Sequence, residues 1–312
     1  MDVSKNNWLE RGLIRAGLLF FSYLTWVFAA RLLVVTVITY FLMFSGSKFQ
    51  EISDVYAANE IAAMGFASLL YILLLTLLSP LTLVTRDEII SWNKLHRRFA
   101  PGVIYGSVLA LGVVVAFLAS GLYRYFGFFI QSDEGILAVF NVAIRGLAIV
   151  CFVFCEEYLF RYKILNQVRS KLSDIYAIIV VALLYCLIKA VQFDVGSRQM
   201  ITLFLVSLAL AIRSIVDGDS SRGAGFWAAI LVVFHVFLGL PVFGNEFQGI
   251  FLVKYQGATD VVADSGTARF LTGGVGGPLS SFALQILLLF DVMQGFFKHK
   301  KTLLNARNKW IK

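Results

Sequence analysis

Long apolar runs separated by short charged segments dominate the 312-residue chain. A helix needs about 20 apolar residues to cross a bilayer, and runs without strict alternation are not typical of a transmembrane barrel. Because the hydrocarbon core offers no partner for an unpaired backbone group, we expect helices throughout. The pattern predicts an all-α polytopic integral membrane bundle of about eight transmembrane helices, at residues 17–44, 61–84, 102–122, 136–160, 176–191, 200–216, 224–243 and 281–297.

The apolar runs follow one another without an internal repeat or a long linker. We therefore interpret residues 1–312 as a single integral-membrane domain. The first run is longer than the apolar part of a signal peptide and lacks a convincing cleavage site, so we expect it to be retained as an anchor.

The composition fits a membrane protein, since 59% of the residues are hydrophobic and 15% are charged. In this layout most of the 27 Lys and Arg residues fall on the side of the membrane that holds both termini. The positive-inside rule then predicts cytoplasmic termini, and we expect an integral protein of the plasma (inner) membrane. The net charge of +8 indicates topology and attraction to anionic lipid. We predict no nucleic-acid partner, because no soluble basic face with groove-reading elements is visible.

Two adjacent carboxylates, Glu156 and Glu157, stand at the end of the fourth apolar run. Ionisable groups at membrane depth are costly and usually face the bundle interior, where they mark working sites. On a helix, Glu157 and Arg161 are four residues apart and share a face in the favourable order. Glu156 is turned about 100° away. The spacing predicts that Glu157 is structural and that Glu156 is free for chemistry.

Few other groups in the apolar runs are capable of chemistry. His235 is the histidine of the seventh run and Lys189 is an ammonium in the fifth, whereas His96 and His299 belong to basic surface segments. A lone buried histidine is often a packing residue, but an unpaired lysine would be costly. For both to meet the two glutamates, the fourth helix must continue through Arg161. For three further ions in the runs, Arg31, Arg145 and Asp291, structural pairing is the simpler interpretation; Arg31 could also snorkel to the interface.

Glu156-Glu157-x-x-x-Arg161 resembles EExxxR, the first motif of the CPBP intramembrane proteases, which include CAAX prenyl endopeptidases and bacteriocin-processing or immunity proteins. Tyr185-x-x-x-Lys189 falls where that family has its second motif, FxxxH. A tryptophan-containing segment that leads to His235-x-x-x-Gly239 resembles the third motif, HxxxN or HxxxD. The resemblance covers about residues 136–294, which we take as the family-like core.

The resemblance implies a glutamate-dependent endopeptidase in which Glu156 activates a water molecule and Glu157 and Arg161 hold the helix end. His235 would help to stabilise the oxyanion. Lys189 replaces the second-motif histidine and Gly239 replaces the third-motif Asn or Asp, so the site departs from the family at both motifs. Lys189 is expected to pair with a glutamate, which would stabilise the fold and weaken the base; a neutral Lys189 acting as the base itself is the alternative.

We expect no cofactor and no metal, because a catalytic zinc normally has three His or carboxylate ligands and an ammonium stands where one might lie. The first functional hypothesis is an endopeptidase that cuts a membrane-associated peptide or protein near the cytoplasmic face. The second is a catalytically silent family member that acts as a membrane scaffold or regulatory partner-binding protein. A transporter is a third class, but inverted repeats are not apparent.

Overall fold

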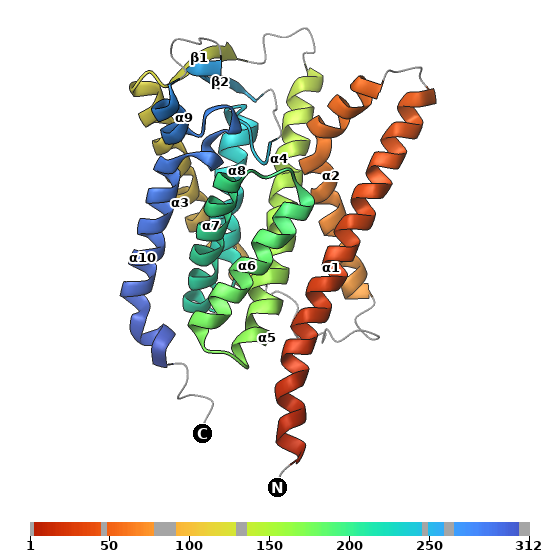
Figure 1. Ribbon diagram of the computed structural model, residues 1–312, viewed down its shortest axis with the longest axis vertical. Coiled ribbons are helices and arrows are strands. Elements are labelled where there is room, and N and C mark those ends of the chain that lie inside the picture. The colour runs from red at the N-terminus through yellow and green to blue at the C-terminus, as the bar shows by residue number, and fades with distance from the viewer. Residues whose placement is uncertain are drawn as a thin grey trace.

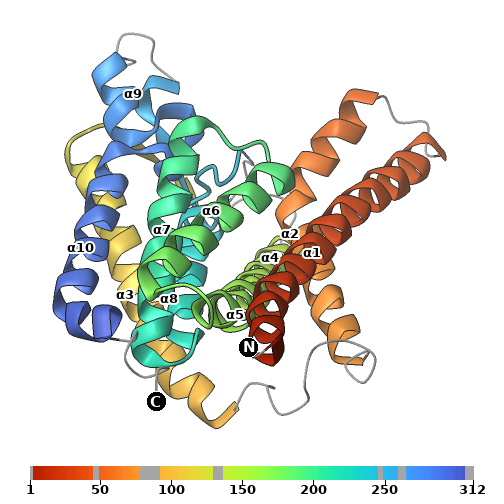
Figure 2. The same cartoon turned by 60° about the horizontal axis from the view of Figure 1, so that its bottom comes forward.

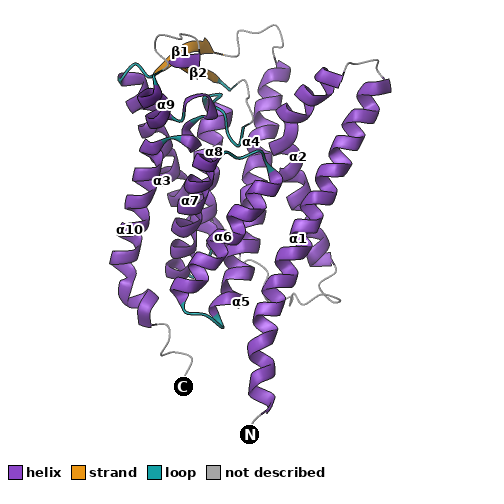
Figure 3. Cartoon of the chain, in the orientation of Figure 1, coloured by secondary structure: helices purple, strands orange, loops and turns teal. Residues whose placement is uncertain are grey.

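The computed structural model describes residues 3–44, 49–77, 92–128, 136–244, 249–258 and 265–305. Its helices are α1 (Val3–Phe44), α2 (Phe49–Leu77), α3 (Trp92–Ala119), α4 (Ile136–Glu157), α5 (Leu165–Arg169), α6 (Asp174–Gln192), α7 (Ser197–Asp217), α8 (Ser221–Leu231), α9 (Gly266–Thr272) and α10 (Phe282–Asn305). Two π-helical segments, η3 (Tyr158–Ile164) and η4 (Val232–Phe237), extend α4 and α8. The all-α prediction is confirmed, and a helix occurs at each of the eight predicted spans (Figure 3).

Within the described residues, five helical segments are long and apolar enough to cross a membrane: 12–40, 98–119, 139–169, 174–192 and 197–217. Two shorter apolar helices cover residues 59–75 and 221–237. An all-α membrane bundle is therefore supported, and the number of eight crossings stays a prediction.

The helices form an elongated bundle in which α4, α6, α7 and α8 lie between two flanking pairs (Figures 1 and 2). The pair α1 and α2 covers one side, and α3 and α10 lie on the other. α1 begins and α10 ends at the same end of the bundle, which we call the terminal end (Figure 1). The side of the membrane that this end faces stays a prediction.

A small antiparallel sheet at the opposite end was not predicted. Strand β1 (Tyr123–Phe128) pairs with β2 (Phe251–Tyr255), with Tyr123 opposite Tyr255. The two strands come from connections that the sequence analysis treated as loops. They lie next to α9, at the end of the bundle opposite the terminal end (Figure 1).

The seventh predicted span was too long. Helical structure ends at Phe237 rather than at residue 243. Gly239 adopts a φ of 63°, and Pro241 follows it, so the helix cannot continue through this segment. Residues 238–244 instead form an irregular segment in which Phe243 has a φ of 54°. For the second span, the predicted end at 78–84 lies outside the described residues.

Two glycines on α3 allow an unusually close approach to α8. A Cβ atom at Gly106 would overlap the backbone carbonyl oxygen of Phe226, and one at Gly102 would overlap that of Arg222. Small residues spaced four apart permit such contact between membrane helices. The close approach packs α8, the helix that carries Trp227, against α3.

Candidate active site

The two glutamates lie where α4 changes from α-helical to π-helical geometry. Helical structure continues from Glu157 through η3 into α5, which meets the condition that the fourth helix extend past Arg161. Glu156 and Glu157 are each 1% exposed and Arg161 is fully buried. Single π-helical turns inside α-helices often occur at functional sites.

Glu157 and Arg161 form the structural pair that their spacing predicts. The Glu157 Oε1 atom lies 3.3 Å from an Arg161 guanidinium nitrogen. The guanidinium also donates a 2.8 Å hydrogen bond to the Ser207 hydroxyl on α7 and lies 4.4 Å from the centre of the Tyr185 ring on α6. Arg161 therefore joins three helices in addition to neutralising a buried carboxylate.

Glu156 forms an ion pair with Lys189 on α6, as the sequence analysis expected of this lysine. The Lys189 Nζ atom lies 2.6 Å from Glu156 Oε2, and the two side chains are 0% and 1% exposed. Four aromatic rings surround the ammonium, with centres 3.9 Å away for Phe152 and 5.2–5.3 Å away for Tyr185, Phe193 and Phe243. Ring faces attract a cation, so the rings stabilise the charged lysine together with the carboxylate.

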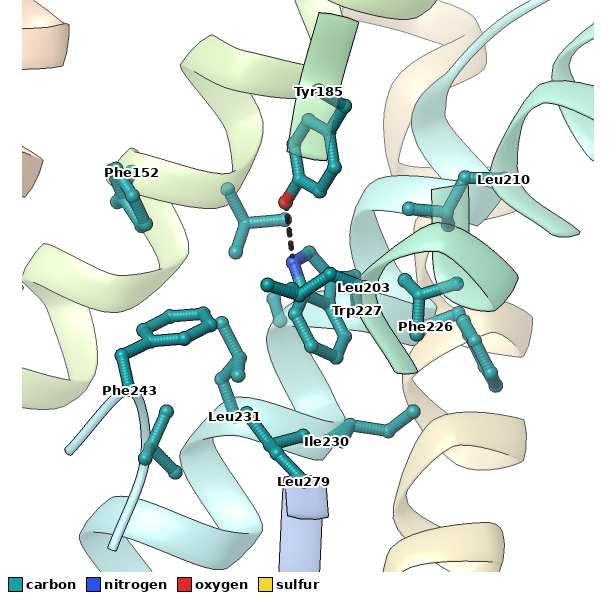
Figure 4. Close-up of a cluster of buried hydrophobic side chains, with 14 of the residues drawn as sticks. Phe152, Tyr185, Leu203, Leu210, Phe226, Trp227, Ile230, Leu231, Phe243 and Leu279 are labelled. Carbon is teal, nitrogen blue, oxygen red and sulfur yellow. Dashed lines mark hydrogen bonds between the residues drawn. The ribbon is translucent and has the colours of Figure 1, made fainter. Parts of the chain in front are cut away.

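Two tyrosines complete the surroundings of the Glu156 carboxylate. Tyr23 on α1 donates to Oε1 and Tyr185 donates to Oε2, each at 3.3 Å. Trp227 on α8 donates a 3.0 Å hydrogen bond to the Tyr185 hydroxyl (Figure 4). Figure 4 also places Phe152 and Phe243 among the buried side chains nearby. Helices α1, α4, α6 and α8 thus all contribute to one polar cluster in an apolar core.

Tyr23 and Tyr185 were not singled out as site residues from the sequence. Tyr185 is the first position of the second-motif segment, which was a usable signal. Tyr23 lies far from the motifs in the sequence and carries no such signal. Its hydroxyl also contacts the Ser68 hydroxyl at 2.9 Å and accepts a 3.2 Å hydrogen bond from Gln192, so α2 supports the cluster indirectly.

His235 lies on η4 and is 2% exposed. It follows Trp227 by eight residues, which separates the two backbones by about 12 Å along the helix. The structure brings together Glu156, Glu157, Arg161 and Lys189. The catalytic role of His235 stays a prediction.

The structure gives polar partners to the other three ions that the sequence places in the apolar runs. Arg31 lies 3.3 Å from the Glu60 carboxylate and donates to the Val191 carbonyl at 3.0 Å. Arg145 donates to the Asn59 side-chain carbonyl at 3.1 Å. Asp291 pairs with Arg213 at 2.7 Å. No group of three or more His, Cys, Asp or Glu side chains suited to a metal occurs in the described part of the chain.

Comparison with known proteins supports the resemblance seen in the motifs. Residues 136–238 match the family model described as Type II CAAX prenyl endopeptidase Rce1-like. The matched segment contains the Glu156 cluster and His235. No curated protein and no solved structure matches the chain.

The family match and the apolar helices together support an integral membrane protein with an endopeptidase-type domain. Glu156, Glu157 and Arg161, which have the EExxxR spacing, lie inside the matched segment, and so does Lys189. Residues 136–238 therefore match the family model of Rce1-like type II CAAX prenyl endopeptidases, which confirms the resemblance to the CPBP intramembrane proteases.

Proposed function

We propose that this protein is a glutamate-dependent intramembrane endopeptidase that cleaves a membrane-associated peptide or protein near the cytoplasmic face. The observation that carries the proposal is the 2.6 Å contact between Glu156 and Lys189, the residues at the first-motif and second-motif positions of the matched family segment. A buried carboxylate with a cation and two hydroxyl donors around it is costly for a membrane bundle to maintain. Such ions inside membrane proteins are typically functional.

In the proposed reaction, the Glu156 carboxylate removes a proton from water while the water oxygen attacks the carbonyl carbon of the scissile peptide bond. The negative charge that develops on the carbonyl oxygen is stabilised by the Lys189 ammonium and the Tyr185 hydroxyl. The carbon–nitrogen bond then breaks, and Glu156 returns the proton to the leaving amine. A positioned general base contributes about 10²–10⁴-fold in rate, and a donor to the oxyanion contributes about 3 kcal/mol.

The burial of the cluster implies that substrate and water enter only after neighbouring side chains move. Glu156 and Lys189 are 1% and 0% exposed. The Phe243 ring, 5.3 Å from the Lys189 ammonium, belongs to the irregular segment after η4 rather than to a helix. A displacement of this segment would uncover Lys189 without breaking a helix. We propose it as the part of the bundle that opens.

A catalytically silent scaffold is the second candidate, and the same ion pair favours it. A lysine that holds Glu156 at 2.6 Å in a closed apolar site stabilises the bundle and competes with water for the base. Gly239 supplies no side-chain donor at the third-motif position where the family has Asn or Asp. The peptidase requires Glu156 to produce a cleaved peptide, whereas the scaffold produces none.

The test compares peptide termini in membranes that contain the wild type or Glu156→Gln. Glu60→Gln is the matched control, since Glu60 is also a buried carboxylate paired with an arginine. We expect new termini with the wild type and with Glu60→Gln, and none with Glu156→Gln. Identical termini in all three samples would reject the peptidase and favour the scaffold.

Lys189→His separates the roles of the lysine. If Lys189 stabilises the oxyanion, the substitution lowers cleavage at the same termini. If Lys189 silences a family-type site, the substitution raises cleavage above that of the wild type.

A further inference from the structure

A cavity of about 260 Å³ lies at the terminal end of the bundle, between α3, α7, α8 and α10. Its lining includes Tyr105, Arg213, Arg222, Asp291 and Lys298. It contains none of the residues of the Glu156 cluster, and the proposed peptidase does not use it. The cavity thus combines an aromatic ring with three cationic side chains.

One wall of the cavity is rigid. An Arg213 guanidinium nitrogen donates to both carboxylate oxygens of Asp291 at 2.7 Å, and the guanidinium lies 4.0 Å from the centre of the Phe226 ring. Tyr105 donates to the same carboxylate at 3.1 Å. Asp291 is thus neutralised by its own partner, while the second terminal nitrogen of Arg213, Nη1, is buried with no hydrogen-bond partner in the described part of the chain.

The rim of the cavity carries positive charge. Arg222 is 48% exposed, and its guanidinium lies 3.9 Å from Asp217, the second acid of the lining. Lys298 is exposed and forms no ion pair with a described residue. The charges of the two lining acids are offset by those of Arg213 and Arg222, so Lys298 gives the lining a net positive charge. The exposed Lys300 and Lys301 follow it on α10.

Apolar surface lies next to this positive rim. On α3, Ile104 and Val108 are 65% and 64% exposed, and on α10, Phe290 and Phe297 are 66% and 64% exposed. These side chains are within one or two turns of the lining residues Tyr105 and Lys298 on the same helices. Basic pockets between membrane helices bind the headgroups of anionic lipids, and apolar surface beside them is suited to acyl chains.

We propose that this cavity binds an anionic phospholipid. The phosphate group would contact Lys298 and Arg222, beside the positively charged Arg213 in the cavity lining. The acyl chains would follow the exposed apolar side chains of α3 and α10. Bound in this way, the lipid would join α10 to α3 and α8 at the terminal end, in addition to the hydrogen bond from Tyr105 to Asp291.

The test uses the purified full-length protein in dodecyl maltoside micelles and native mass spectrometry to measure apparent Kd values. The ligands are phosphatidylglycerol, phosphatidylcholine with matched acyl chains, and inorganic phosphate. The variants are Lys298→Gln and Lys298→Gln with Arg222→Gln. Lys254→Gln is the control, because Lys254 is exposed on β2 at the opposite end. Equal melting temperatures without added lipid establish that the variants are folded.

We expect phosphatidylglycerol to bind more tightly than phosphatidylcholine. Loss of one basic contact should weaken its binding about fivefold, and loss of two about 25-fold. The control should bind as the wild type does. Equal binding of the two lipids, or an unchanged Kd in Lys298→Gln, would overturn the site. Inorganic phosphate that binds alone and displaces the lipid would show a free-phosphate site and overturn the assignment to lipid. If the double variant does not fold, the single variant decides.

Discussion

Replacing Lys189 by Met tests the buried ion pair at the centre of the bundle. Met fills much of the lysine volume but leaves Glu156 without a cation, in a site where the carboxylate is 1% exposed. Removing one partner of a buried pair costs about 3–5 kcal/mol. Glu156 keeps the hydrogen bonds from Tyr23 and Tyr185. We therefore expect the lower end, about 3 kcal/mol, as the loss in free energy of unfolding.

The pair between Arg98 and Asp219 provides the control. It is similarly short, at 2.7 Å, but its side chains are 43% and 21% exposed. Such a surface pair contributes about 0–1 kcal/mol, so Arg98→Met should change the free energy of unfolding little. The double variant with Glu156→Gln and Lys189→Met should recover most of the stability, because neutral groups replace both ions.

The free energies are measured by unfolding in mixed micelles of dodecyl maltoside and dodecyl sulfate, followed by far-ultraviolet circular dichroism. A loss in Lys189→Met no larger than that in Arg98→Met would refute the reasoning, since it would mean that water or another cation replaces the lysine. A double variant less stable than Lys189→Met would also contradict it.

Three further predictions concern the same bundle. Arg161→Met should lower the free energy of unfolding by about 3 kcal/mol because it leaves Glu157 buried without its cation. Arg169→Met breaks a pair whose arginine is 27% exposed, so it should lower the free energy of unfolding less. Equal melting profiles for the two variants would contradict a structural role for Arg161. Tyr185→Phe keeps the ring beside Arg161 but removes the hydroxyl that joins Trp227 to Glu156. The same assay should therefore show a free energy of unfolding lower by about 1–3 kcal/mol. An unchanged free energy of unfolding would count against this hydrogen-bond chain. Gly106→Ala should destabilise the protein because the new methyl group meets the Phe226 carbonyl oxygen. Gly112→Ala on the same helix has no atom within 4 Å of the new methyl group and should be neutral or stabilising. Equal melting temperatures for these two variants would argue against close α3–α8 packing.

Local spacing explains which parts of the site were predictable. Glu157 and Arg161 are neighbours on any helix, so their contact follows from the sequence. The pairing of Lys189 with a glutamate follows from the cost of an unpaired ammonium in lipid and from the order of the family motifs. The positions of the eight apolar runs follow from bilayer thickness, and a helix occurs at each of them in the described residues.

The contacts that were missed depend on distant parts of the chain or on backbone geometry. Tyr23 reaches Glu156 across 133 positions of sequence, and no local pattern indicates such a contact. The π-helical segments η3 and η4 have no sequence signature, although they hold Arg161 and His235. The spacing of Gly102 and Gly106 was visible as GxxxG and was overlooked. Predicting whether His235 meets Glu156 requires the depth of each residue in the membrane, which hydrophobic periodicity does not provide.

Cleavage by the purified protein tests the dependence on Glu156 most directly. The substrate is the membrane peptide whose new terminus is found in the comparison of membranes, and it is reconstituted in proteoliposomes with the wild type, Glu156→Gln or Glu60→Gln. We predict that the wild type and Glu60→Gln produce the same terminus and that Glu156→Gln loses at least the 10²-fold that a general base contributes. Cleavage by Glu156→Gln at the rate of the wild type would contradict a glutamate-dependent endopeptidase.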